Sequence, residues 1–175
     1  MGDSAADLGK VVDELCKSGS IEVSHVSKLA QQIGKAFNVK PDEVAVLTMT
    51  QQDKFLRFIV PEKLQKVGDI PMTSTNSLAV RTARDRKPEV INNFSTARHP
   101  TVFEAVPLGT QRGEPIQKIM SAPVAAENKT IGVIQISRKG KSVTAAGPDF
   151  TPKDLNELVA IGGVLGRCLM LLSTE

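Results

Sequence analysis

Apolar residues recur every three or four positions in three long segments of the chain, and this spacing predicts helices there. The segments are residues 8–15, residues 23–37 and residues 151–172. Pro41 prevents an easy continuation of the second segment. Thr151 is a good N-cap for the third segment, which carries a leucine-rich stripe of about two and a half heptads. The chain is therefore expected to have helices at both ends.

Between these helices the pattern changes to short apolar runs rich in β-branched residues, which predict strands. Short connections join the first two runs and the last two, so both pairs are predicted to be antiparallel hairpins. A further helix is expected over residues 77–84, with Ser74 or Thr75 as its cap. The five predicted strands are residues 43–50, 54–60, 89–92, 118–126 and 130–138.

Two stretches have no regular pattern. Residues 93–118 contain Pro and Gly repeatedly, and a connection of this length inside a compact domain is typically functional or mobile. Residues 139–149 form a second loop, rich in Gly, Ser and Lys. The order of the predicted elements indicates an α+β layered domain. We expect one structural domain, in which residues 1–40 form helices that pack on residues 41–175.

The composition is that of a folded globular protein, with 175 residues of which 41% are apolar and 23% charged. No apolar run approaches the roughly 20 residues of a membrane span, and no signal peptide pattern begins the sequence. We therefore expect a cytoplasmic protein without membrane contact. The formal net charge is only +3, and six Phe with no Trp or Tyr provide few stacking platforms, so a nucleic-acid partner is not expected.

The chain offers little to a metal ion or a prosthetic group. Cys16 and Cys168 are far apart in the sequence, and no Cys/His cluster has the spacing of a zinc site. Two cysteines in a cytosolic chain are expected to stay reduced and to be buried in helical faces. We expect no metal and no cofactor.

Three stretches, taken in order, carry a family likeness. Residues 68–71 (GDIP) are followed by a Ser-led helix and by a strand anchored on Pro88; residues 121–124 lead into a hairpin whose second strand opens with IGV at 131–133; and residues 150–155 begin the last helix. No single motif is specific, but their order and spacing over residues 40–172 resemble the GAF domain family.

This resemblance implies a GAF/PAS-like fold. Its central antiparallel sheet has five to six strands, with terminal helices on one face. The helix near residues 75–86 and the long loop would cover the other face and enclose a small-molecule pocket. Members of the family sense cyclic nucleotides, bilins, haem, amino acids or other small molecules, or serve only as dimerisation modules.

The residues that define the best-known ligand classes are missing. The Asn-Lys-x-x-x-Phe-x-x-x-Asp-Glu run of cyclic-GMP-binding members is absent. A covalent bilin needs a pocket cysteine, and a lone loop histidine such as His99 is more often solvated than a haem ligand. Reduction of free methionine sulfoxide, the catalytic use known for this fold, needs nucleophilic and resolving cysteines in the pocket. That activity is the weaker alternative, and we expect a protein that is not an enzyme.

The expected pocket would be lined by polar groups on one sheet face and by residues of the long loop. On the last predicted strand, Val133, Gln135 and Ser137 share one face. The candidate ligand-binding residues are Ser121, Gln135, Ser137, Asn93, Arg98, His99 and Phe103. An excess of basic side chains would surround them and suit an anionic ligand, although an ordinary solvated surface would look the same. These residues are Arg81, Arg84, Arg86, Lys87, Arg98, His99, Arg112 and Lys118.

The sequence leads to two main hypotheses. In the first, the chain is a non-catalytic sensor domain for signal transduction that binds a small, anionic molecule. It would form a homodimer through the 8–37 and 154–172 helices, whose apolar stripes are wider than one sheet face requires, and would signal to a separate partner protein. In the second, the chain is an interaction and dimerisation scaffold with a vestigial pocket.

Overall fold

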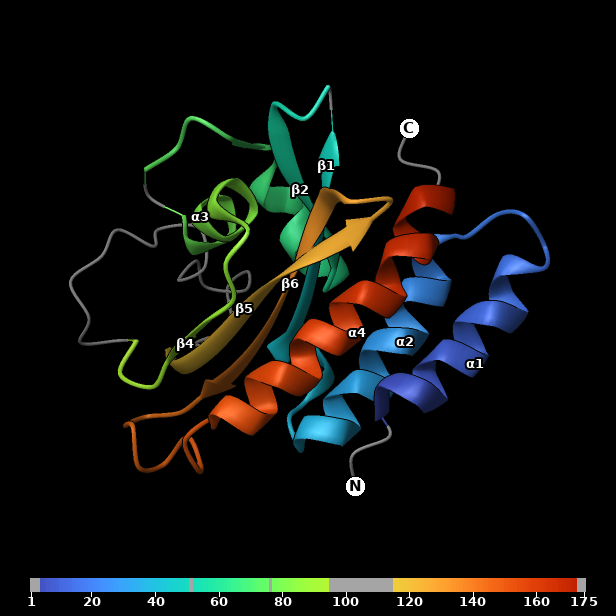
Figure 1. The fold of residues 1–175 in the computed structure, drawn as a ribbon. Coiled ribbons are helices and arrows are strands. Elements are labelled where there is room, and N and C mark those ends of the chain that lie inside the picture. The colour runs from blue at the N-terminus through green and yellow to red at the C-terminus, as the bar shows by residue number, and fades with distance from the viewer. Residues whose placement is uncertain (1–3, 51, 76, 95–114, 173–175) are drawn as a thin grey trace.

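The computed structural model describes residues 4–50, 52–75, 77–94 and 115–172. A curled sheet separates one group of helices from a smaller group on its other face (Figure 1). The helices are α1 (Ser4–Cys16), α2 (Val23–Phe37), α3 (Leu78–Asp85) and α4 (Pro152–Leu171), with two 3-10 turns, η1 (Pro41–Glu43) and η2 (Glu62–Val67). The strands are β1 (Val44–Thr50), β2 (Phe55–Val60), β3 (Ile70–Pro71), β4 (Glu89–Ile91), β5 (Ile116–Ala126) and β6 (Lys129–Lys139). The predicted α+β architecture is confirmed.

The sheet is antiparallel throughout and has the order β3-β2-β1-β6-β5-β4. Both predicted hairpins, β1 with β2 and β5 with β6, are present. Glu127 and Asn128 have positive φ angles, as a tight two-residue turn requires, and this turn sets the register of the long hairpin. The register places Ser121 opposite Gln135. The sequence pattern did not predict β3, whose two residues are too few for a visible periodicity.

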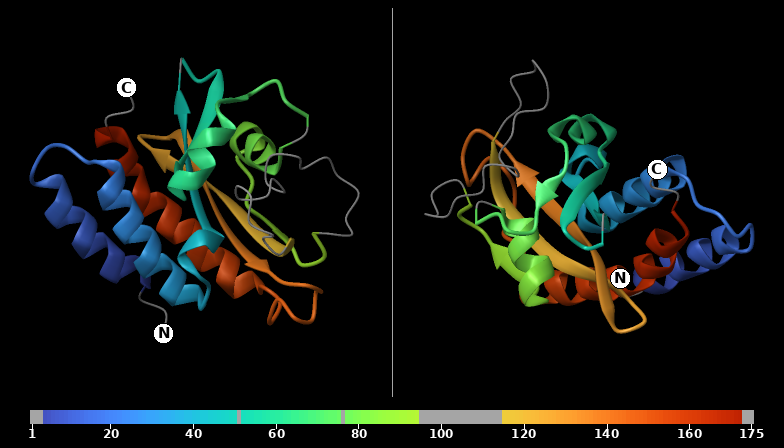
Figure 2. Two further views of the ribbon diagram at one scale, coloured as in Figure 1. Left: turned by 180° about the vertical axis from the view of Figure 1, so that it is seen from behind. Right: turned by 90° about the horizontal axis from the view of Figure 1, so that it is seen from above.

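The terminal helices lie on one side of the sheet, as expected: α2 and α4 cover its face, and α1 packs on these two helices (Figure 2). Their apolar stripes form one core with inward residues of β1, β5 and β6, and members of every predicted stripe are buried there. The width of the stripes is explained within a single chain, because α1 packs on both α4 and α2 while α4 also packs on β5. The side chains that suggested a dimer seam, such as Leu8, Val12 and Leu165, are therefore core residues.

Two glycines allow α4 to approach β5 closely. A Cβ on Gly162 would lie 2.6 Å from the Pro123 carbonyl oxygen, and a Cβ on Gly166 would lie 2.9 Å from the Ala125 carbonyl carbon. Ordinary contact between carbon atoms begins at about 3.5 Å, so neither position has room for a side chain.

Arg138 joins the end of α2 to the loop that precedes α4. Its guanidinium donates hydrogen bonds to the carbonyl oxygens of Phe37, at 3.0 Å, and Asn38, at 3.3 Å. These carbonyls lie at the C-terminal end of α2, where backbone acceptors lack helical partners and a cation is favourable. The same guanidinium lies 4.6 Å from the centre of the Phe150 ring. Burial lowers the pKa of Arg138, although nearby Asp154 and Glu43 oppose the shift.

The opposite face of the sheet carries a smaller core beneath η2 and α3. Leu47, Leu56, Phe58 and Val133 from the sheet meet Ala79, Val80 and Ala83 from α3. Arg57 holds the segment before β3 by a two-pronged ion pair with Asp69, at 2.8 and 3.1 Å. The hydrogen bond from Arg57 is the main cause of the lowered pKa of Asp69. Asp69 belongs to the GDIP stretch, which therefore has a structural role in attaching β3 to the sheet.

Across the described residues, no helix is both long and apolar enough to cross a membrane.

Candidate functional site

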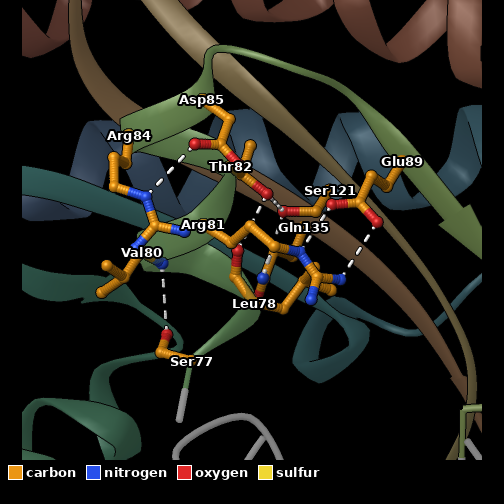
Figure 3. Close-up of polar contacts among 10 residues, drawn as sticks. All are labelled: Ser77, Leu78, Val80, Arg81, Thr82, Arg84, Asp85, Glu89, Ser121 and Gln135. Carbon is orange, nitrogen blue, oxygen red and sulfur yellow. Dashed lines mark hydrogen bonds and ion pairs between the residues drawn. The ribbon is translucent and has the colours of Figure 1, made fainter. Parts of the chain in front are cut away.

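A chain of hydrogen bonds between buried polar side chains connects the sheet to α3 (Figure 3). The Gln135 amide donates to the Ser121 hydroxyl at 3.2 Å, and the hydroxyls of Ser121 and Thr82 are 2.7 Å apart. Thr82 in turn donates to the Leu78 carbonyl at 2.9 Å. Because the single hydroxyl hydrogen of Thr82 is donated to the Leu78 carbonyl, the Ser121 hydroxyl must be the donor in its bond with Thr82. The bonds therefore run in one direction, from β6 through β5 to the backbone of α3.

These three side chains are almost completely removed from solvent. Thr82 and Ser121 are 0% exposed and Gln135 is 3% exposed. A buried hydroxyl or amide lowers the stability of the fold unless it is hydrogen-bonded. The folded protein must therefore keep these hydrogen bonds intact. We call Thr82, Ser121 and Gln135 the polar cluster.

Local sequence features place each member. The tight turn of the β5–β6 hairpin sets Ser121 opposite Gln135, and alternation along the strands directs both toward α3. Ser77 is the N-cap of α3 and accepts a hydrogen bond from the Val80 amide at 3.2 Å. Thr82 then lies one turn after Leu78, on the buried side of the helix.

An ion pair closes the polar cluster toward solvent. Arg81 donates to both carboxylate oxygens of Glu89, at 2.8 and 3.0 Å, which links α3 to β4 (Figure 3). Arg84 pairs with its neighbour Asp85. The basic side chains closest to the polar cluster along α3 are therefore already neutralised by carboxylates.

The basic side chains that were expected to surround the pocket are only partly found there. Lys118 was expected at the junction of the loop and the next strand, among the basic side chains around the pocket; it lies on β5, but points to the opposite face from Ser121. It is buried, donates to the Gly147 carbonyl and forms an ion pair with Asp149 at 2.7 Å. Arg86 and Lys87 are exposed. Arg98, His99 and Arg112 lie outside the described residues.

The structure brings together two of the predicted ligand-binding residues, Ser121 and Gln135. Ser137 shares their sheet face, but its hydroxyl donates to the Glu43 carbonyl at 3.4 Å. Asn93 is exposed in the turn after β4. Arg98, His99 and Phe103 lie outside the described residues. Sequence reasoning missed Thr82, and the available signal was a polar residue within the apolar face of a short helix.

Both cysteines lie in the helical layer, on the other side of the sheet from the polar cluster. Cys168 is fully buried, as expected, and Cys16 is half-buried. Burial is the main cause that raises the pKa of Cys168 to about 11. In the part of the chain that the structure describes, His, Cys, Asp and Glu nowhere gather in threes that could hold a metal ion.

A groove of about 260 Å³ lies between α1, α2 and α4, far from α3. Its apolar floor includes Leu8, Ile33 and Ile161, and its polar margin includes Asp7 and Lys35. The floor residues belong to the main core, so the groove lies in the helical layer, across the sheet from the polar cluster.

In a comparison with protein families, the model of the GAF domain matches residues 22–169. The match includes the sheet, α3 and most of α4, and leaves α1 outside. No curated protein sequence matches the chain.

Several solved structures share the fold. The GAF domain of an Acinetobacter phosphoenolpyruvate-protein phosphotransferase has a TM-score of 0.69 at 13% identity, covering 96% of this chain and 91% of that one. The free methionine-R-sulfoxide reductase of Neisseria meningitidis has a TM-score of 0.65 at 13% identity, covering 95% and 86%. A domain of a putative two-component sensor histidine kinase from Sinorhizobium meliloti has a TM-score of 0.55 at 16% identity, covering 82% and 87%. At these identities the likeness concerns the fold.

Proposed function

We propose that this chain, which belongs to the GAF domain family, is a non-catalytic sensor domain that binds a small molecule. In this proposal it acts as a homodimer and passes its signal to a separate partner protein. The family match and the similar folds found in sensor and regulatory proteins support a signalling role.

The observation that carries ligand binding is the polar cluster at the interface between α3 and the sheet. An eight-residue helix is held on this sheet partly by hydrogen bonds where apolar side chains would pack more simply. A ligand with a carbonyl or carboxylate oxygen could accept from Gln135 or Ser121 and replace part of this chain of bonds. Such an exchange would couple ligand binding to the position of α3, because Thr82 is hydrogen-bonded to the backbone of that helix at Leu78.

An anionic ligand remains part of the proposal. Arg81 is the basic side chain nearest to the polar cluster on α3. Its planar guanidinium can donate two parallel hydrogen bonds to a carboxylate or phosphate. Binding an anion there requires Arg81 to exchange Glu89 for the ligand.

A thermal-shift screen tests ligand binding. Amino acids, small carboxylates, nucleotides and sugar phosphates would be screened against the wild type, and native mass spectrometry would reveal a metabolite that co-purifies. A compound at 100-fold its Kd should stabilise the fold by about 2.7 kcal/mol, which is several degrees in Tm. Gln135→Leu should abolish the shift, whereas Gln31→Leu, on the exposed side of α2, should keep it.

The scaffold hypothesis is the second candidate, and the closed arrangement of the site favours it. Thr82 and Ser121 satisfy one another, and Arg81 is engaged by Glu89. The scaffold hypothesis is supported if no compound in the screen shifts the Tm and the purified protein carries no small molecule.

The non-catalytic part of the proposal is supported by the position of the cysteines. A reductase of free methionine sulfoxide needs its thiols beside the substrate, whereas Cys16 and Cys168 lie across the sheet from the polar cluster. Incubation with free methionine sulfoxide and a thiol reductant should give no methionine. Turnover that disappears in the Cys16→Ala and Cys168→Ala variants would refute this part.

The homodimer must use side chains that the core leaves exposed. On α1 and α4 these include Val11, Val159 and Met170, which are 37%, 40% and 51% exposed. Sedimentation at tens of micromolar should give a dimer, and Val159→Glu should weaken it. A wild type that sediments as a monomer would refute the dimer and leave ligand binding untouched.

A further inference from the structure

The fold brings the two cysteines of the chain together from its opposite ends. Cys16 is the last residue of α1, and Cys168 lies in the last turns of α4, which packs along α1. Cys168 is a member of the main core, and Cys16 packs against that core. After burial, the neighbouring Cys16 side chain is the next cause of the raised pKa of Cys168, in keeping with the packing of α1 along α4 at this point.

A second contact sets the position of the two helices at this point. Arg167, the residue before Cys168, forms an ion pair with Asp13, which is one helical turn before Cys16. Just beyond the cysteines, the Ile21 amide donates to the Leu171 carbonyl at 3.3 Å, and Ile21 forms a bridge with Leu172. The thiols therefore lie between two links that both join the first part of the chain to α4.

We propose that Cys16 and Cys168 form a dithiol that a hydroperoxide oxidises to an intramolecular disulfide, which attaches α1 covalently to α4. This reaction is separate from ligand binding, because it takes place on the opposite side of the sheet from the polar cluster.

The chemistry requires two thiols and one hydroperoxide. The Cys16 thiolate attacks one peroxide oxygen, the O–O bond breaks, and the alkoxide or hydroxide that leaves is protonated. Cys16 is then a sulfenic acid. The Cys168 sulfur attacks the Cys16 sulfur, the S–O bond breaks, and hydroxide leaves as water with the Cys168 proton. Both sulfurs are oxidised and the peroxide is reduced to an alcohol or water; a dithiol reductant then restores both thiols by exchange and is itself oxidised to a disulfide.

The roles of the two cysteines follow from their burial. Cys16 is half-buried and can meet a dissolved oxidant, whereas Cys168 is fully buried and cannot. Cys168 is therefore the resolving thiol. Its only route to oxidation is through its neighbour, which makes the pair selective for the internal disulfide.

The disulfide would change how α1 is attached to the rest of the domain. This helix lies outside residues 22–169, the part that matches the family model, and in the reduced protein it is held by packing and by the Asp13–Arg167 pair. A bond between Cys16 and Cys168 closes a loop around nearly the whole domain. Long loops gain most from closure, so Tm should rise by roughly 10 °C.

The experiment uses the full chain, reduced and then treated with a small excess of hydrogen peroxide. Intact mass should fall by two hydrogens, free thiols should disappear, and peptide mapping without reductant should join the peptides of Cys16 and Cys168. The Tm should rise and return to its starting value with dithiothreitol.

Two variants act as controls. Cys16→Ser should keep the buried Cys168 thiol under the same treatment, and Cys168→Ala should gain oxygen on Cys16 or form intermolecular dimers, with no rise in Tm. If the wild type keeps both thiols under peroxide, or forms only intermolecular disulfides, the proposal is wrong. This readout needs no variant, so it decides the question even if Cys168→Ala does not fold.

Discussion

Replacing Gly166 with alanine tests how tightly α4 is packed on the sheet. The new Cβ would lie 2.9 Å from the carbonyl carbon of Ala125 and 3.2 Å from the Ala126 side chain. Carbon atoms normally approach to about 3.5–4.0 Å, and the nearest neighbour is backbone that cannot rotate away. The helix must therefore move from β5 by a distance on the order of 1 Å.

Two opposing terms decide the size of the effect. Alanine is about 1 kcal/mol better than glycine inside a helix. Overpacking of a core costs about 1–3 kcal/mol, and occasionally more. Because the new Cβ meets backbone that cannot rotate away, we expect a cost just above this range, about 4 kcal/mol, which leaves Gly166→Ala about 3 kcal/mol less stable than the wild type. For a domain of this size, that corresponds to a Tm lower by roughly 10 °C.

Gly163 on the same helix is the matched control, because nothing lies within 4 Å of a Cβ there. Gly163→Ala should gain the helix-propensity term alone and raise Tm by about 2–4 °C. Urea unfolding and thermal scans of the two variants measure the difference. If Gly166→Ala is as stable as Gly163→Ala, the close approach of α4 to β5 is wrong.

Three further predictions concern polar contacts. Thr82→Val and Ser121→Ala should each lower the free energy of unfolding by about 1–2 kcal/mol. The double variant should lose less than the sum of the two, because the side chains share a hydrogen bond; urea unfolding of the wild type and the three variants measures this, and additive losses would contradict it. Arg138→Ala should lower the free energy of unfolding by about 2–3 kcal/mol through loss of the bonds at the end of α2, whereas Lys141→Ala on the surface should stay within about 0.5 kcal/mol of the wild type. The pKa of Asp69 is lowered in the fold, so its contribution is present above the unfolded pKa of about 3.9 and is lost as pH falls through the folded value. Asp69→Asn should therefore lower stability at pH 7 by about 1 kcal/mol and weaken the loss on acidification, as urea titrations at several pH values would reveal.

Helix and strand positions followed from the sequence because their causes are local. Apolar spacing predicted α1, α2 and α4, and Thr151 marked the start of α4, where the structure has a complete capping box. The β5–β6 hairpin was also confirmed, together with the shared face of Gln135 and Ser137.

The structure gives two sequence features another explanation than the one first predicted. Lys118 was predicted both as the first residue of a strand and as part of the basic surround of the pocket; it is a strand residue, but β5 begins earlier, at Ile116, and strand alternation turns Lys118 to the helical face, away from the pocket. The leucine stripe of α4 was interpreted as a dimer seam. A heptad pattern records only that a helix packs along another helix, and here α1 of the same chain is such a neighbour.

The sequence by itself determined the elements, their order, the α+β class and the family likeness, since each depends on residues close together along the chain. Only the tertiary structure decided that Thr82 meets Ser121, that Arg81 is engaged by Glu89, and that the end of α1 that carries Cys16 packs on the part of α4 that carries Cys168. These pairs depend on how α3 and α4 are placed against a sheet whose register is set elsewhere. No local pattern encodes that placement, because it results from the packing of all the elements at once.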